Sequence, residues 1–238
     1  MRKTYAFSPE GISDNIYMIV MGDNPVSLAH KKRSLYSWHR NGLKPKIFEA
    51  TTPLYMDQGY CKELQFDEKT SKGSRHFKNT VFTPTEKSVW CSHYRLWQKC
   101  ANANLPLIVI EHDIKLKKSI DFSFLEEDID NNIVPLCETS VRGKKGTFIL
   151  PGGAYFLTPP MAKKLIVAAL RKSQGKGITN NSDHPINVRC LNIRSDSREE
   201  KFRYVCCEQN IDRGLGVTVD HGKGRPFNDE VFDAVLLT

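Results

Sequence analysis

The chain has 238 residues, of which 39% are hydrophobic and 26% are charged, and these proportions are ordinary for a globular protein. A chain of this length can bury a core in one domain, and its apolar runs, such as residues 105–110, are too short to cross a bilayer. The 35 lysines and arginines against 27 acidic residues give a formal net charge of +8, which attracts anionic partners, although a basic surface without a partner is the ordinary alternative.

The N-terminal residues and the cysteines point to a reducing compartment. The first residues lack the apolar stretch and small-residue cleavage site of a secretory signal, so we expect a cytoplasmic protein, in the host cytoplasm if a phage encodes it. The seven cysteines are odd in number and show no C-x-x-C spacing, which argues against a disulfide framework. Cys91 and Cys100 fall in a helical stretch and are expected to be small buried side chains.

The first predicted elements alternate strand, helix and strand. Residues 16–21 form an unbroken apolar run of strand length, and a helix capped by Asn24 and ended by Gly42 follows. A second strand is predicted at residues 45–50. This βαβ order predicts an α/β, Rossmann-like fold with a mainly parallel sheet flanked by helices, as a single domain over residues 1–238.

Residues 53–82 interrupt this order. They are polar, and they contain two glycines and the basic stretch at residues 72–78. We predict a long loop or a small excursion there, and loops of this length in a compact domain are usually functional or mobile.

The next helix and strand lead to the central candidate site. A capping box opens a predicted helix over residues 83–103. Ser92 and His93 on this helix are candidate cleft contacts, although an ordinary buried histidine is the alternative for His93. The hydrophobic strand at residues 105–110 then ends abruptly in Glu111-His112-Asp113.

The carboxylates of Glu111 and Asp113 stand where ligands bind in open α/β sheets, at the carboxyl end of a strand. Two carboxylates at such an end suit Mg²⁺ or Mn²⁺. A bound ion of this kind can bridge a diphosphate and neutralise its charge as it leaves. Spacing alone does not distinguish this site from a strand end that becomes polar at the surface.

The second half of the chain contains shorter elements. Gly152 and Gly153 open a predicted strand, and glycine in a strand indicates either close approach of a ligand to the backbone or a bulge. Thr158 then caps a further helix. The remaining predicted elements are strands at residues 132–136, 147–150 and within 200–207, and a loop at 175–185.

Five pieces of the chain stand in an order that matches a known family. They are the first strand with the basic helix residues 31–33, the stretch 85–93 with Glu86, Ser92 and His93, the strand end 111–113, the glycine-then-tyrosine strand 152–158, and Ser182-Asp183-His184-Pro185. This order resembles glycosyltransferase family 25, the lipopolysaccharide-biosynthesis type with a GT-A fold. The resemblance covers residues 16–50 and 83–187 and leaves the tail, 190–238, unaligned. At position 112 histidine replaces the middle acid of the family's E-D-D.

The resemblance implies a hexosyl- or pentosyltransferase that uses a nucleotide sugar, such as a UDP-sugar, with Mn²⁺ or Mg²⁺. It implies catalytic roles for Glu111 and for Asp183, the latter as general base if the reaction inverts configuration. Asp113 is the implied metal ligand, and His221 is a candidate for a second ligand, for which a solvent-exposed loop residue is the alternative. The implied donor contacts are Ser92, His93, Glu111, His112, Asp113, Gly152 and Gly153.

Two classes of acceptor are compatible with the sequence, and the net charge slightly favours DNA. One is a lipopolysaccharide or other glycan; the other is a hydroxymethylated or already glycosylated base in duplex phage DNA. DNA phosphates would then be contacted by Arg75, Lys78, Lys144, Lys223 and Arg225. A basic nucleic-acid-binding domain without catalysis is a further alternative, and the oligomeric state is not predicted.

Overall fold

The computed structural model describes residues 9–67, 84–126, 133–137, 139–143, 146–150, 153–175, 177–178 and 206–209. Its elements in chain order are α1 (Pro9–Ser13), β1 (Ile16–Val20), α2 (Pro25–His39), β2 (Lys46–Glu49), α3 (Pro53–Asp57), α4 (Pro84–Ala103), β3 (Leu107–Glu111), β4 (Ile114–Leu116), η1 (Phe122–Glu126), β5 (Val134–Pro135), β6 (Thr139–Gly143), β7 (Gly146–Leu150), β8 (Ala154–Leu157), α5 (Pro159–Gln174) and β9 (Cys207–Gln209).

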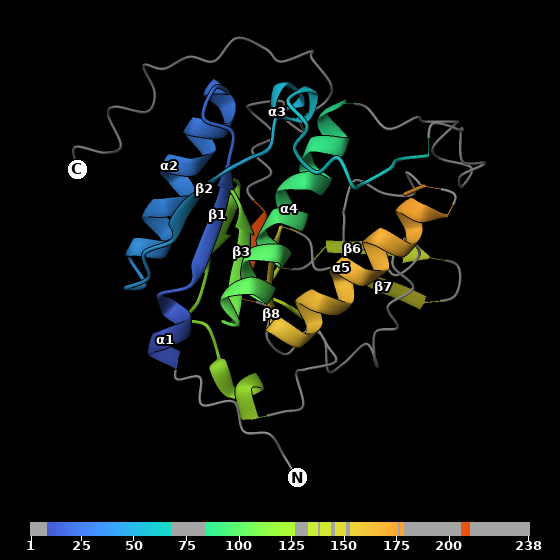
Figure 1. Cartoon of the computed structure of the whole chain (residues 1–238). Helices are drawn as coiled ribbons and strands as arrows, with labels where there is room; N and C mark the ends of the chain where they lie inside the picture. The colour runs from blue at the N-terminus through green and yellow to red at the C-terminus, as the bar shows by residue number, and fades with distance from the viewer. Residues whose placement is uncertain are drawn as a thin grey trace.

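A five-stranded sheet in the order β2-β1-β3-β8-β5 forms the centre of the molecule (Figure 1). β1 pairs in parallel with β2 and with β3, whereas β8 runs antiparallel between β3 and β5. Four of the five strands therefore share one direction. The predicted α/β fold with a mainly parallel sheet flanked by helices is confirmed. Two smaller ladders pair β4 with β9 and β6 with β7.

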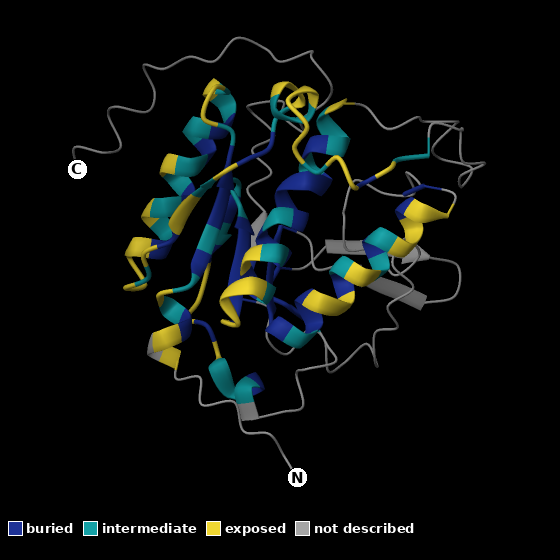
Figure 2. Cartoon of the chain, in the orientation of Figure 1, coloured by how far each residue is buried: buried dark blue, intermediate teal, exposed yellow. Residues whose placement is uncertain are grey.

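The sheet separates two hydrophobic cores, because successive residues of a strand face opposite sides. In β3, Leu107 and Val109 join the core under α4 and α5, whereas Ile108 and Ile110 join the core under α1 and α2. Buried residues accordingly run through the central strands and along the inner sides of these helices (Figure 2).

The ends of α2 and α5 follow the signals in the sequence. The side chain of Asn24 accepts hydrogen bonds from the N–H groups of Val26 and Ser27, and Gly42 adopts a φ of +75°, which glycine favours. Thr158 accepts a hydrogen bond from the Met161 N–H at the start of α5. Both predicted helices are confirmed. They could be predicted because these capping signals act on residues close to them in the sequence.

The predicted loop or excursion at 53–82 begins with a short helix. Pro53–Asp57 forms the short helix α3, because Thr52 and Pro53 supply the extended cap residue and the fixed φ that favour a first helical turn. Residues 68–83 lie outside the described part of the chain. Within the described residues, none of the helices combines the length and hydropathy that a membrane span requires.

Candidate active site

A pocket of about 330 Å³ opens at the edge of the sheet where β1, β2 and β3 end. Its lining comes from residues 19–24, 50–53, 85–93 and 111–112. Three of these segments follow or end a parallel strand, and the fourth is the first half of α4. The predicted position of the site, at the carboxyl ends of the strands, therefore coincides with a real pocket.

The first half of α4 forms one wall of the pocket. Thr85, Ser88, Val89 and Ser92 recur at the three- and four-residue spacing of one helical face, and all of them line the pocket. The pocket also receives Asp23 and Asn24 from the start of α2. Among the described residues, its lining contains no lysine or arginine.

Ser92 joins α4 to the carboxyl end of β2. Its hydroxyl donates to the Ser88 carbonyl oxygen at 2.9 Å and accepts from the Thr51 N–H at 2.9 Å. Thr51 and Ser92 are both buried. The side chain predicted to contact the donor therefore also holds two walls of the pocket together.

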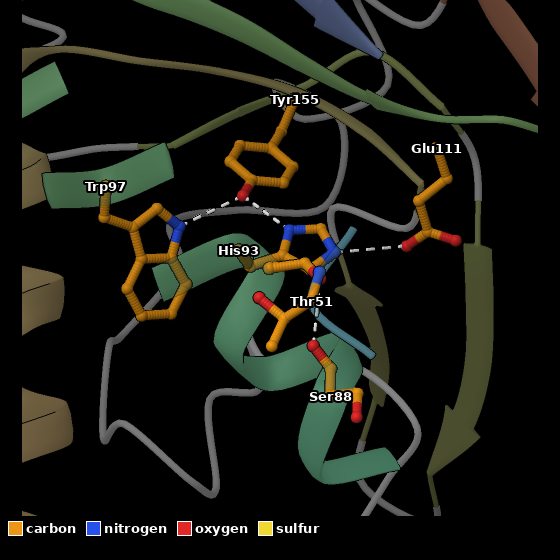
Figure 3. Close-up of polar contacts among 7 residues, drawn as sticks. Thr51, Ser88, His93, Trp97, Glu111 and Tyr155 are labelled. Atoms are coloured by element: carbon orange, nitrogen blue, oxygen red, sulfur yellow. Dashed lines mark hydrogen bonds and ion pairs between the residues drawn. The ribbon is translucent and has the colours of Figure 1, made fainter. Parts of the chain in front are cut away.

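His93 stands at the centre of a buried polar row (Figure 3). The Trp97 indole N–H donates to the Tyr155 hydroxyl oxygen at 3.0 Å, and that oxygen lies 2.8 Å from His93 Nδ1. On the other side of the ring, His93 Nε2 lies 3.4 Å from Glu111 Oε1. His93 is buried, as the ordinary alternative of a core histidine requires. Its Nε2 atom nevertheless faces the carboxylate of Glu111, which lines the pocket.

Glu111 is the member of this row that reaches solvent. Its side chain is 24% exposed, against 3% for that of His93. Burial raises the pKa of Tyr155 above its ordinary value; the Trp97 hydrogen bond lowers it, and the charge of Glu111 raises it further. Tyr155 is therefore a protonated phenol with a hydrogen to donate, and Glu111 presents an oxygen acceptor to the pocket.

His112 and Asp113 form the turn after β3. His112 lines the pocket, and its ring centroid lies 5.9 Å from that of His30, whereas Asp113 is not among the lining residues. Within the described residues, no group of three or more histidine, cysteine or acidic side chains is arranged to hold a metal ion. The roles of Asp113 as metal ligand and of His112 as donor contact remain predictions.

Gly153 lies beside Glu111, whose N–H donates to the Gly153 carbonyl oxygen. A Cβ at Gly153 would lie 2.5 Å from Ile114 Cδ1 and 3.5 Å from Glu111 Cβ. The side chain that approaches Gly153 closely is therefore the protein's own Ile114. Whether a donor also contacts Gly153 stays a prediction.

The other predicted site residues lie outside the described part of the chain: Gly152, Asp183, His221, Arg75, Lys78, Lys144, Lys223 and Arg225. The structure adds residues that were not predicted for the site. Asp23 and Thr51 line the pocket, and Tyr155 with Trp97 supports His93 from behind. The glycine-then-tyrosine strand was a sequence signal for Tyr155, but its partner could not be identified from that pattern.

Comparison with known families gives one match. The model of glycosyltransferase family 25, described as an LPS biosynthesis protein family, matches residues 14–173. This range contains every segment that lines the pocket and also Tyr155. Neither the curated proteins nor the solved structures include a significant match to this chain.

Proposed function

Since the chain belongs to glycosyltransferase family 25, we propose that it moves a hexosyl or pentosyl group from a nucleotide-sugar donor to a hydroxyl group, and that the donor binds in the pocket beside Glu111. The glycosyltransferase activity itself follows from the family. The nature of the donor and of the acceptor is our proposal.

One observation carries the location of the donor site: the family match and the pocket coincide. The matched range supplies all four lining segments, and these segments meet where parallel strands end. The volume of about 330 Å³ lies at the lower end of the range for small-molecule sites. A volume of this size suits the sugar or the nucleoside part of the donor.

The polar groups of the pocket suit a sugar nucleotide. Glu111 offers carboxylate oxygens that accept hydrogen bonds from sugar hydroxyl groups, and Ser88 and Thr85 offer hydroxyl groups. The pocket also faces the N-terminal ends of α2 and α4, through Asn24 and Thr85. Two helix N-termini carry partial positive charge, which attracts a diphosphate at a site without lysine or arginine in its described lining.

The divalent metal and the catalytic base remain proposals. The described residues do not form a metal site by themselves. Asp113 and His221 are the proposed ligands, and an ion held by them would neutralise charge on the departing diphosphate. Asp183 is the proposed general base for an inverting reaction, and Glu111 the proposed contact to the transferred sugar.

We propose a glycan acceptor in preference to DNA. The description of the matched family refers to lipopolysaccharide biosynthesis, which supports a glycan. The DNA hypothesis depends on the net charge of +8 and on basic residues that lie outside the described part of the chain. A hydroxymethylated duplex therefore serves as the competing acceptor in the test.

The test compares the wild-type protein with Glu111→Gln across a panel of nucleotide sugars, with and without Mn²⁺. We expect one donor to raise the melting temperature and to be consumed, and Glu111→Gln to reduce turnover about 100-fold or more while keeping the fold. Glu49→Gln is the matched control, because Glu49 ends the neighbouring strand β2 and does not line the pocket. The proposal fails if no nucleotide sugar stabilises the protein, or if both variants behave alike.

The acceptor is tested with the same donor on lipopolysaccharide oligosaccharides and on hydroxymethylated duplex DNA. Transfer to the oligosaccharide supports our proposal. Transfer to the duplex, with binding that weakens steeply as salt rises, would replace it with the DNA hypothesis.

A further inference from the structure

The polar row behind the pocket joins two elements that are distant in the sequence. His93 and Trp97 lie one turn apart on α4, and Tyr155 comes from β8, where it pairs with Val109 of β3. The rings of His93 and Tyr155 stack at 5.8 Å with an interplanar angle of 22°. Trp97, Tyr155 and His93 are all buried, so water does not compete for their hydrogen bonds.

The proton positions in this row follow from which groups can donate. An indole N–H only donates, so the Tyr155 oxygen accepts from Trp97. The phenol hydrogen then needs an acceptor, and His93 Nδ1 at 2.8 Å is the one that the described residues provide. Nδ1 must therefore be unprotonated, and the proton of the neutral imidazole must be on Nε2.

The alternative arrangements leave a buried group unsatisfied. If Nδ1 carried a proton, in the neutral or the charged ring, it would donate to the Tyr155 oxygen. The phenol hydrogen would then lack an acceptor among the described residues. A buried donor without a partner is unfavourable by about 1–3 kcal/mol, and the Nε2–H form avoids this for the phenol. It also turns an N–H, and not a lone pair, toward the Glu111 carboxylate, so the Nε2–H form is preferred.

We propose that Tyr155, supported by Trp97, is a positioning residue that holds His93 in the Nε2–H tautomer, so that a fixed N–H faces Glu111 at the pocket wall. Nε2 lies 3.4 Å from Glu111 Oε1 and makes no hydrogen bond within the described part of the chain. This distance is longer than an ordinary hydrogen bond. The N–H therefore attracts the carboxylate and is available to an oxygen of a bound donor.

The effect of Tyr155 on donor binding rests on the proposed function, whereas the tautomer of His93 does not depend on that function. With a fixed N–H, the Glu111 carboxylate keeps one orientation in the free enzyme, so less ordering is needed when the donor binds. Without it, the imidazole can exchange between tautomers, and one of them presents a lone pair to the carboxylate and repels it. We expect this change to weaken donor binding more than it slows the chemical step.

The first measurement is the ¹⁵N spectrum of the histidine ring nitrogens in the full chain, in which the two nitrogens of each ring report the tautomer. The chain has 7 histidines, and His93→Gln identifies the His93 signals. We expect the Nε2–H tautomer in the wild-type protein and a mixture in Tyr155→Phe, which loses only the hydroxyl group. A wild-type spectrum of the Nδ1–H form, or of a doubly protonated ring, overturns the proposal even if no variant folds.

The second measurement is the donor kinetics of Tyr155→Phe beside Tyr94→Phe. Tyr94 is also buried on the same side of the sheet, in contact with Trp97, and it is not part of the row, so it controls for loss of a buried hydroxyl. We expect kcat/KM for the donor to fall about tenfold in Tyr155→Phe, mainly through KM, with little change in Tyr94→Phe. Equal losses in the two variants, or an unchanged tautomer in Tyr155→Phe, contradict the proposal.

The two proposals fail separately. If the wild-type protein transfers no sugar, the proposed function is wrong, and the ¹⁵N spectra still decide whether Tyr155 controls the tautomer of His93. If transfer occurs while Tyr155→Phe has wild-type spectra and kinetics, the enzyme proposal stands and the positioning proposal is wrong.

Discussion

Replacing Ser92 by alanine removes one hydroxyl group from the junction between α4 and the end of β2. In the wild-type structure this hydroxyl accepts from the Thr51 N–H and donates to the Ser88 carbonyl oxygen. The Ser88 carbonyl belongs to α4, where a backbone N–H of the next turn can also donate to it. Thr51, by contrast, is buried and lies two residues after Glu49, the last residue of β2. The variant therefore leaves one buried backbone donor without its partner.

The expected loss of stability is the difference between two effects. An unsatisfied buried N–H lowers the free energy of unfolding by about 1–3 kcal/mol. Alanine is a better helix former than serine, which returns about 0.5 kcal/mol. We therefore expect a net loss of about 1–2 kcal/mol, equivalent to about 2–8 °C in melting temperature for a chain of this size.

The assay is urea unfolding of Ser92→Ala beside Ser88→Ala. Ser88 lies one turn earlier on the same helix and is also buried, but its hydroxyl donates to the Pro84 carbonyl oxygen at 2.8 Å, and Met56 Sδ lies 3.5 Å from it. It accepts from no backbone N–H among the described residues. Ser88→Ala should thus stay within about 0.5 kcal/mol of wild type, because it leaves no buried backbone donor unpaired.

Two results would refute this reasoning. One is a Ser92→Ala protein as stable as wild type; the other is an equal loss in both serine variants, which would mean that serine burial matters and the Thr51 hydrogen bond does not. Hydrogen exchange at the Thr51 N–H gives an independent check, since it should become faster in Ser92→Ala and remain slow in Ser88→Ala.

Two further predictions concern packing and pH. Gly153→Ala places a Cβ 2.5 Å from Ile114 Cδ1 and should lower the free energy of unfolding by about 1–3 kcal/mol, whereas Gly22→Ala, which has no atom within 4 Å of the new Cβ, should have little effect; equal melting temperatures would contradict this. The pKa of Tyr94 is raised to about 12 by burial and by nearby Glu63, so its neutral form is favoured in the folded state. Its contribution to stability is complete below the ordinary tyrosine pKa of about 10 and is lost as the pH rises through about 12. Tyr94→Phe should therefore flatten the fall in stability over this range, and an unchanged slope in alkaline unfolding curves would show that Tyr94 is not responsible.

The sequence predicted those parts of the fold whose causes are local. Asn24 and Gly42 bound α2 because a side-chain cap and a left-handed glycine act within one helical turn. The apolar runs of β1 and β3 identify buried strands in the same way. β4 was not predicted. It has only three residues, and its partner strand, β9, lies about 90 residues later in the chain, so no local pattern indicates the pairing.

The residues of the candidate site also differ in whether the sequence could predict them. Glu111, Ser92 and His93 were predicted for the site because the resemblance to the family adds to what their places show, a carboxylate after a buried strand and two side chains on the preceding helix; all three line the pocket. The partner of His93 was not predicted. It depends on the antiparallel register of β8, which places Tyr155 opposite Val109, and no periodicity within either strand specifies that register.

The position of β8 in the sheet also affects the order in which the site is completed during synthesis. All the residues that line the pocket precede position 113, so they are synthesised before Tyr155. Tyr155 emerges later and reaches His93 only when β8 has inserted between β3 and β5. The hydrogen-bonded state of the His93 ring therefore reports that β8 is in place beside β3.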